Sequence, residues 1–547
     1  MSASRILSAD RVIVCDGAMG TMIHSKGVPL GQSFDEVNID GPAVVEGIHK
    51  AYVEAGAEIL ETNTFGANRI KLENYGLSHK VRELNIAGAR IAKRAAGDAA
   101  FVAGSVGPTG RLMQPLGPLD FDLAFEVYRD QITALCEGGV DLLIIETIQD
   151  LREAKAAMLA AKTVTEVPMI CQMSFVQEGK SMMGTGPDTA AVVLSSFGAD
   201  LVGTNCGTGP QEMLDAVRAM ARVTSLGISA QPNAGLPRFF EGRLMYLTTP
   251  EYTADFAQRF VEAGAKVVGG CCGTTPEHIK AIAEAVKGLV PVKRAGDGLT
   301  RLASRTSVYE IGTGTPVLIG SRLGCPSLSE AAVREGFQAA QDEAERQFEQ
   351  GARVIALECG ADSEKAGAIR RLVELVQSAC PGALYLVGSE PGALEAALRA
   401  VEGRALVSVS RPVGVVIDSL LPLAKRYGGA VLVRTRADAS AQDTPEESLR
   451  AARRVIQAAE QLGLEKTGIL VEPGSLFTDE GRVNEDTLRA LRLLKSDLKV
   501  GTAIEHKPGE PTGDVAVAAL RRAFESGADV LIADPSSAEV QAALSGP

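Results

Sequence analysis

Three cysteines of this sequence follow short apolar stretches interrupted by glycine. Cys271 and Cys272 stand side by side after the run Val-Val-Gly-Gly at residues 267–270. Cys206 follows Gly-Thr-Asn at residues 203–205. A barrel of parallel strands delivers side chains from its strand ends to one rim, where chemistry takes place. Three thiolates on that rim would form a zinc site with its fourth position open, which is typical of a catalytic zinc site.

A metal-binding role for these cysteines competes with an ordinary structural one. Buried free cysteine is a common small core residue, and we expect no more of the five cysteines in or beside apolar runs, which are Cys15, Cys136, Cys171, Cys359 and Cys380. The adjacent pair differs because it directly follows a predicted strand, lies between glycines and has a third cysteine at an equivalent strand end. His278 comes after the helix start at residues 275–277, so we expect a helix residue and not a ligand.

The ligand set itself favours one reaction class. A free thiol has a pKa near 8.5 and is mostly protonated at neutral pH. Zinc coordination removes that proton and keeps the thiolate available as ligand and nucleophile. Three cysteine thiolates give the site surplus negative charge, so an added substrate thiolate should stay electron-rich. Alkyl transfer to a thiol is therefore indicated, whereas hydrolytic zinc sites usually have His or carboxylate ligands.

Two carboxylates end predicted strands of the same half of the chain. Asp16 follows the first apolar run and Glu146 follows the fourth. Each could be a helix cap or a rim residue whose hydrogen bonds are satisfied within the protein. The functional alternative is that they recognise the ammonium group of a substrate, and the residues alone leave both interpretations open.

Eight short apolar runs in the first half would position these residues. Helical patterns separate the runs, and polar or glycine-rich residues follow nearly every one. This alternation is typical of βα units, and eight of them predict a (β/α)8 barrel. The runs lie at residues 12–15, 57–60, 101–104, 142–145, 169–173, 201–203, 227–230 and 265–269.

A second set of eight runs predicts a second barrel in tandem, with a doubly wound sheet as the alternative. We expect an α/β protein of two TIM barrels, in which residues 1–288 form the zinc barrel, 289–316 a linker without clear apolar period, and 317–547 the second barrel. The second set of runs lies at residues 317–320, 354–357, 384–387, 405–409, 430–433, 468–471, 498–502 and 529–532.

Composition excludes several other classes of protein. A net charge of −13 argues against a broad nucleic-acid surface, and aromatic residues at 4% with no tryptophan make a base-stacking platform unlikely. No apolar run reaches the roughly 18 residues of a membrane helix. The amino terminus has no secretory apolar segment, so we expect a cytoplasmic protein that binds neither nucleic acid nor membranes.

Six motifs of the first half resemble the homocysteine S-methyltransferase domain. Their order and the opening motif are similar to the N-terminal module of the cobalamin-dependent methionine synthase family. The resemblance covers residues from about 8 to 288. The motifs are DGAMGT from Asp16, ETNTF from Glu61, GSVGP from Gly104, GTNC from Gly203, QPNAG from Gln231 and GGCCGT from Gly269.

This resemblance implies an enzyme, a zinc-dependent methyltransferase that converts homocysteine to methionine. It implies that Cys206, Cys271 and Cys272 bind zinc with the homocysteine sulfur as fourth ligand, and that Asp16 and Glu146 hold the amino-acid end of homocysteine. The cobalamin-binding module that follows in that family is not found before the chain ends at residue 547. We therefore expect the methyl group to come from methylcobalamin on a separate corrinoid protein. The alternative is a sulfonium donor, S-methylmethionine or S-adenosylmethionine, with the second barrel as scaffold or docking module.

The second half is similar to the pterin-binding module that holds methyltetrahydrofolate in the same family, but its ligand positions differ. Buried donor–acceptor pairs hold a pterin, and such sites lose much affinity when a partner is missing. We therefore expect this barrel not to bind the pterin in the usual way, with altered folate binding through Glu358 and Glu472 as the alternative. The departures from the motif lie at Gly324, residues 358–360, residues 386–388, near Ser408 and at residues 472–473.

Overall fold

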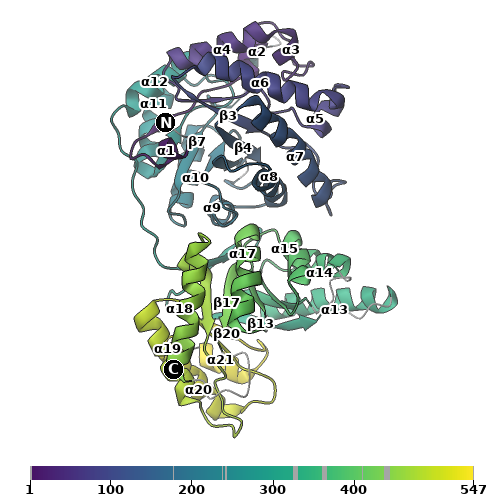
Figure 1. The fold of residues 1–547 in the computed structure, drawn as a ribbon, viewed down its shortest axis with the longest axis vertical. Helices are drawn as coiled ribbons and strands as arrows, with labels where there is room; N and C mark the ends of the chain where they lie inside the picture. The colour runs from purple at the N-terminus through teal and green to yellow at the C-terminus, as the bar shows by residue number, and fades with distance from the viewer. Residues whose placement is uncertain are drawn as a thin grey trace. The chain divides into compact units, whose positions relative to one another are not determined.

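A computed structural model gives the fold of residues 3–545, except for 177, 237, 241–242, 325–329, 360–365, 410 and 436–443. The chain divides into two compact units, residues 1–295 and 296–547, each built around a barrel of parallel strands (Figure 1). The prediction of two (β/α)8 barrels in tandem is thereby confirmed. Gly360, one of the expected pterin positions, lies outside the described residues.

The first unit contains an eight-stranded parallel sheet in the order β1-β10-β7-β6-β5-β4-β3-β2. A parallel bridge between Cys15, just after β1, and Ile59 in β2 joins the two edges of this sheet. The strands are β1 (Ile13–Val14), β2 (Ile59–Glu61), β3 (Phe101–Val106), β4 (Leu142–Ile148), β5 (Met169–Met173), β6 (Leu201–Asn205), β7 (Gly227–Gln231) and β10 (Ala265–Val268).

Alternate residues of these strands fill the barrel. Leu142 and Ile144 of β4, Ile13 of β1, Ile170 of β5 and Val267 of β10 belong to one buried cluster. Residues two apart on a strand point to the same face, so this spacing sends them together into the interior. The polar residues just past the strand ends are thereby carried to the rim.

Helices surround the first barrel, and several begin at a recognisable cap. Asp120 accepts a hydrogen bond from the Leu123 N–H, and Thr249 does the same for Tyr252, with proline as the first helical residue. The helices are α1 (Ala3–Ser8), α2 (Gly20–Ser25), α3 (Val37–Asp40), α4 (Pro42–Glu54), α5 (Arg69–Glu73), η1 (Ser78–Lys80), α6 (Val81–Ala96), α7 (Phe121–Gly138), α8 (Leu151–Val164), α9 (Pro187–Ser196), α10 (Pro210–Ala221), α11 (Pro250–Ala263) and α12 (Pro276–Val286). A short hairpin, β8 (Arg238–Phe240) and β9 (Arg243–Met245), follows β7.

The second unit is a closed barrel of eight parallel strands. Pairing of Val317 in β13 with Val530 in β20 joins the first strand to the last, so the doubly wound alternative is wrong. The strands are β13 (Val317–Gly324), β14 (Val354–Glu358), β15 (Ala383–Gly388), β16 (Leu406–Val409), β17 (Ala430–Arg434), β18 (Ile469–Glu472), β19 (Gly501–Glu505) and β20 (Val530–Ile532).

Helices likewise alternate with the strands of the second barrel. The helix start expected at residue 444 is formed as a capping box, in which Thr444 and Glu447 each bond the other's backbone N–H. The helices are α13 (Glu330–Glu349), α14 (Ala366–Ala379), α15 (Pro391–Ala400), α16 (Val413–Val415), η3 (Val416–Leu420), α17 (Leu421–Tyr427), α18 (Pro445–Gln461), η4 (Lys466–Gly468), α19 (Glu485–Leu493), η5 (Leu494–Leu498), α20 (Gly513–Glu525) and α21 (Ala538–Leu544).

An antiparallel hairpin lies within the stretch that we expected to be only a linker. It consists of β11 (Thr300–Ala303) and β12 (Val308–Ile311) and belongs to the second unit. Leu302 and Ile311 are buried in the core of the second barrel, and Ala303 bridges to Arg404 just before β16. Only these two side chains of the hairpin are buried members of that core cluster. The apolar pattern of the hairpin is therefore too short to be recognised in the sequence.

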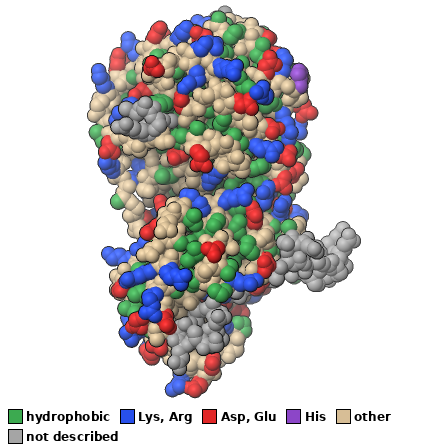
Figure 2. Space-filling view, in the orientation of Figure 1, with side chains coloured by type: hydrophobic (Ala, Val, Ile, Leu, Met, Phe, Trp, Pro, Cys, Tyr) green, Lys and Arg blue, Asp and Glu red, His purple; other side chains and the backbone are tan. Residues whose placement is uncertain are grey.

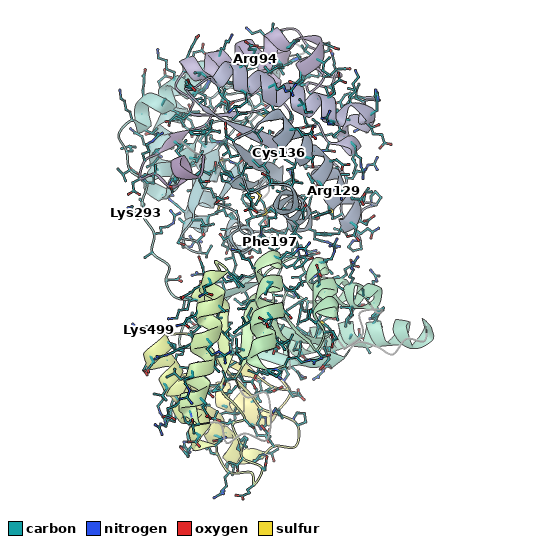
Figure 3. The ribbon with its side chains drawn as sticks, viewed as in Figure 1. Arg94, Arg129, Cys136, Phe197, Lys293 and Lys499 are labelled. Carbon is teal, nitrogen blue, oxygen red and sulfur yellow. The ribbon has the colours of Figure 1, made fainter. Side chains whose placement is uncertain are left out.

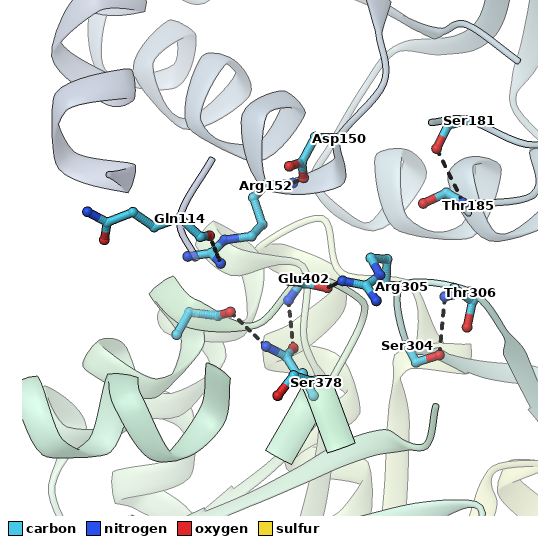
Figure 4. A network of polar contacts seen from close by, with 12 residues as sticks. Gln114, Asp150, Arg152, Ser181, Thr185, Ser304, Arg305, Thr306, Ser378 and Glu402 are labelled. Carbon is cyan, nitrogen blue, oxygen red and sulfur yellow. Dashed lines mark hydrogen bonds and ion pairs between the residues drawn. The ribbon is translucent and has the colours of Figure 1, made fainter. Parts of the chain in front are cut away.

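The turn of this hairpin is held by polar contacts. Ser304 Oγ accepts hydrogen bonds from the backbone N–H groups of Thr306, at 3.3 Å, and Ser307, at 3.2 Å (Figure 4). Arg305 forms an ion pair with Glu402 at 3.5 Å. These contacts fix the hairpin to the segment between α15 and β16 of the same unit.

Charged side chains of both signs are interspersed on the face of the molecule drawn in Figure 2. No described helix combines the length and the apolar character that crossing a membrane requires. Among the cysteines expected to be structural, Cys15, Cys171, Cys359 and Cys380 are buried, whereas Cys136 on α7 is half-buried (Figure 3).

Candidate functional site

The three candidate zinc ligands come together at the carboxyl ends of β6 and β10. The sulfur atoms of Cys206, Cys271 and Cys272 all lie within 4.8 Å of one another, and those of Cys206 and Cys272 are 4.0 Å apart. Zinc–sulfur bonds of about 2.3 Å in a tetrahedron separate neighbouring sulfurs by about 3.8 Å. The arrangement therefore fits a zinc ion held by three thiolates.

Backbone contacts between neighbouring loops fix these sulfurs. Cys206 has the left-handed φ of 56°, which is uncommon outside glycine, and its N–H bonds to the Gln231 carbonyl at 3.1 Å. The Cys271 N–H bonds to the Pro232 carbonyl at 2.8 Å. The Cys272 N–H bonds to Asn233 Oδ1 at 3.1 Å. The Gln-Pro-Asn segment that ends β7 and follows it thus holds both cysteine loops in place.

The sulfurs influence each other's protonation. Hydrogen bonds from Cys271 and Cys272 lower the pKa of Cys206 well below its ordinary value. The same contacts with Cys206 raise the pKa of Cys271 and of Cys272. One thiolate therefore forms easily and the other two resist ionisation, so a bound cation would stabilise the fully ionised cluster.

A cavity of about 390 Å³ opens beside the sulfurs. Its lining includes the polar side chains of Ser105, Glu61 and Glu146 as well as the three cysteines. It also includes the apolar or aromatic side chains of Leu30, Phe34, Phe65 and Tyr75. A concave site with a few convergent polar groups is the usual form of a small-molecule site.

Glu146 faces this cavity from the end of β4. Ser105 Oγ donates to its Oε1 at 2.6 Å, and Asn205 Nδ2 donates to its Oε2 at 2.9 Å. A register irregularity between Ile145 and Ile148, together with the φ of 58° at Thr147, forms a bulge that turns the strand at this point. Burial raises the pKa of Glu146, so a substrate cation would favour its ionised form.

Asp16 occupies a different place from Glu146. It is buried just after β1, and its Oδ2 accepts a hydrogen bond from the Glu61 backbone N–H at 3.0 Å. It is not among the residues that line the cavity, where Glu61 stands instead. The structure therefore places Asp16 behind the wall of the cavity, and its direct contact with a substrate stays a prediction.

The model of the family described as homocysteine S-methyltransferase matches residues 13–286, half of the chain. The chain belongs to this family. The matched segment contains the three clustered cysteines, Asp16 and Glu146.

Two curated relatives of this family member are methionine synthases. That of Mycobacterium leprae (strain TN) is 30% identical over 533 residues, which is 89% of this chain and 44% of the relative. That of Mycobacterium tuberculosis (strain ATCC 25618 / H37Rv) is 29% identical over 528 residues, again 89% and 44%. The chain therefore spans less than half the length of these relatives.

Two solved structures are each similar to about half of the chain. The metallated homocysteine methyltransferase MmuM of Escherichia coli gives a TM-score of 0.44 at 23% identity, covering 52% of this chain and 98% of that one. A dihydropteroate synthase of Xanthomonas albilineans with 4-aminobenzoic acid gives a TM-score of 0.35 at 20% identity, covering 45% of this chain and 96% of that one.

The sequence analysis did not single out Glu61 as a residue of the candidate site. Glu61 is the last residue of β2, and its Oε1 accepts a hydrogen bond from Gln231 Nε2 at 2.6 Å. Burial, and then the charges of Glu146 and Asp16, raise the pKa of Glu61. Its position at a strand end was the available signal. His278 lies on α12 as expected, where its ring nitrogen Nδ1 closes a capping box with Thr275.

Proposed function

We propose that residues 1–288 form a zinc-dependent barrel that transfers a methyl group to the sulfur of homocysteine. The observation that carries this proposal is the cluster of three sulfurs within 4.8 Å, beside a cavity whose wall holds Glu146. Three thiolate ligands leave one tetrahedral position open for a substrate sulfur. Bound zinc would supply the Lewis acidity that favours the deprotonated form of that thiol.

The residues of the chain would orient the amino acid. Glu146 would accept hydrogen bonds from the substrate ammonium while Ser105 and Asn205 hold the carboxylate in place. In the transfer, the substrate thiolate attacks the methyl carbon in line. The sulfur–carbon bond forms as the bond from carbon to the donor atom breaks, and the electron pair of that bond leaves with the donor.

The proposed donor is methylcobalamin carried by a corrinoid protein. The resemblance of the six motifs to the methionine synthase module supports it. The alternative is a sulfonium compound, from which a neutral thioether would leave. A donor panel with zinc-loaded protein and homocysteine distinguishes the two. Turnover with S-methylmethionine or S-adenosylmethionine, and none with methylcobalamin, would select the alternative.

We propose that the second barrel, residues 317–547 with the preceding hairpin, acts as a scaffold or docking module and does not hold a pterin in the usual way. Its strand ends carry charges that already pair with each other: Arg434 bonds Glu472 at 2.9 Å and Glu505 at 3.3 Å. The Tyr385 hydroxyl pairs with Ser408 at 2.7 Å. Titration with methyltetrahydrofolate tests this, and micromolar binding would contradict it.

Metal analysis tests the zinc assignment directly. We expect one zinc per wild-type chain and its loss in Cys206→Ala or Cys272→Ala, because two thiolates bind far more weakly than three. Cys136→Ala is the matched control, since Cys136 is a half-buried cysteine outside the cluster. Stoichiometric zinc in either cluster variant would refute the assignment.

A further inference from the structure

Lys71 belongs to the short helix α5, which is labelled in Figure 1. Its side chain lines the same cavity as the sulfur cluster. Its backbone is held in place, because Asn68 caps the helix and accepts the Lys71 N–H at 3.0 Å. Its ammonium nitrogen lies 4.2 Å from the centroid of the Phe65 ring, which also lines the cavity. A cation over an aromatic face is moderately stabilised there. The charge is therefore held at the wall of the cavity.

This ammonium has no counter-ion in contact. Among the described residues, none forms a hydrogen bond or an ion pair with Lys71 Nζ, although the side chain is half-buried. The nearby acid Asp35 bonds the Gly66 N–H at 2.9 Å and Ser33 Oγ at 3.2 Å instead. Burial lowers the pKa of Lys71, while the charge of Asp35 acts in the opposite direction.

Lys71 is also the one cation among the described residues that line this cavity. The charged side chains sharing the wall with it are the acids Asp35, Glu61 and Glu146. An amino-acid thiol presents three groups for recognition: a sulfur, an ammonium and a carboxylate. The sulfur cluster suits the first and Glu61 and Glu146 suit the second. The carboxylate needs a hydrogen-bond donor, preferably a charged one.

We propose that Lys71 binds the α-carboxylate of the amino-acid thiol in this cavity and so makes the site selective for thiols that carry a carboxylate. The inference rests on the proposed function of the sulfur cluster. Leu30, Phe65 and Tyr75 line the cavity together with Lys71, whose side chain is half-buried. An ion pair in such a setting is stronger than one in bulk water.

Binding titrations of zinc-loaded protein with two thiols test this. One is L-homocysteine and the other is 3-aminopropane-1-thiol, which is homocysteine without its carboxylate. We expect Lys71→Met to weaken homocysteine binding roughly ten- to a hundred-fold, the effect of losing a charge-assisted hydrogen bond, and to leave the aminothiol unchanged. Lys71→Arg should keep most of the preference because it keeps the charge. Lys280→Met, at an exposed lysine of α12, is the matched control.

Each outcome decides between a recognition role and a structural one. A lost preference for homocysteine in Lys71→Met, with aminothiol binding intact, supports the inference. Equal weakening of both thiols would mean that Lys71 only shapes the wall of the cavity. Unchanged affinity for both thiols would mean that other donors hold the carboxylate. Either result overturns the inference about Lys71 and leaves the proposed function standing. If the wild type binds neither thiol, the proposed function fails and the inference fails with it.

Discussion

The side-chain amide of Asn205 joins the carboxylate of Glu146 to the sulfur cluster. Its Nδ2 lies 2.9 Å from Glu146 Oε2 and 3.8 Å from the sulfur of Cys271. Asn205 is the last residue of β6, directly before Cys206. A single strand end therefore positions both the proposed ammonium site and the proposed metal site, so the two parts of a bound amino-acid thiol would be held at a fixed spacing.

Removal of this amide should loosen the carboxylate without removing the metal. In Asn205→Ala we expect homocysteine to bind about ten-fold more weakly, because Glu146 loses one of its buried hydrogen-bond donors. Zinc content should stay at the wild-type value, since the three sulfurs remain. Calorimetric titration and metal analysis measure the two quantities, and Gln211→Ala, at an exposed amide of α10, is the control. Loss of zinc together with binding would show that Asn205 acts on the cysteine loop instead.

Glu146→Gln should reveal which end of the substrate this residue contacts. The amide keeps the shape of the side chain but loses the charge that an ammonium group requires, so homocysteine affinity should fall roughly ten- to a hundred-fold. The comparison ligand is 4-mercaptobutyrate, which is homocysteine without its amino group, and its affinity should not fall. Binding of the two thiols to zinc-loaded protein gives the answer. Parallel losses for both ligands would contradict an ammonium contact.

His49 should make the first barrel sensitive to acid. It is completely buried on α4, and neither ring nitrogen has a hydrogen-bond partner in the described part of the chain. Burial lowers its pKa to about 4 from the ordinary value of 6.5. As the pH falls, His49 takes up a proton in the unfolded chain before it does so in the folded protein. The stability of the folded state that is present above pH 6.5 is therefore lost between pH 6.5 and pH 4.

A histidine substitution tests this pH dependence. Between pH 7.5 and pH 5, protonation of His49 in the unfolded chain should lower the free energy of unfolding by about 2 kcal/mol. His49→Leu should remove that part of the pH dependence, while His79→Leu, in η1, should not. Urea unfolding followed by circular dichroism at the two pH values measures the difference. Identical pH dependence in wild type and His49→Leu would rule out this role.

Arg434→Met should destabilise the second barrel. The substitution leaves Glu472 and Glu505 facing each other at adjacent strand ends, with exposed side-chain fractions of only 8% and 13%. Breaking one partner out of a buried ion pair typically costs about 3 to 5 kcal/mol. Arg450→Met removes an exposed pair on α18 and should cost less than about 1 kcal/mol. Equal unfolding midpoints for the two variants would show that the charges at the barrel mouth are not coupled.

The hairpin before the second barrel should be part of its folded core. Leu302→Ala removes a fully buried side chain from that core and should cost about 2 to 5 kcal/mol. Val515→Ala changes an exposed side chain of α20 and should have little effect. Denaturant unfolding of the two variants gives the comparison. A negligible loss in Leu302→Ala would mean that the hairpin behaves as the linker that the sequence suggested.

Sequence patterns were sufficient for the features that depend on neighbouring residues. The apolar runs that became β4 and β6 are buried strands of four or more residues, and the cap at Thr444 is a contact between residues three apart. The cysteine cluster was also predictable, because parallel strand ends of a barrel must meet at one rim. The placement of Asp16 was less accessible, since only the fold shows that Glu61 lines the cavity and that Asp16, bonded to the Glu61 backbone N–H, does not.

Tertiary structure alone decided the features that depend on distant residues. Barrel closure through Cys15 and Ile59 joins strands far apart in the sequence, and strand counting cannot establish it. The hairpin that contains Leu302 was missed because only two of its side chains, Leu302 and Ile311, are buried in the core cluster. Lys71 lies in none of the motifs of the sequence, and only the fold places its ammonium at the wall of the cavity, beside Phe65. Short segments encode local helix and strand propensity. Burial, barrel closure and charge compensation depend instead on residues distant in the sequence that the fold places in contact.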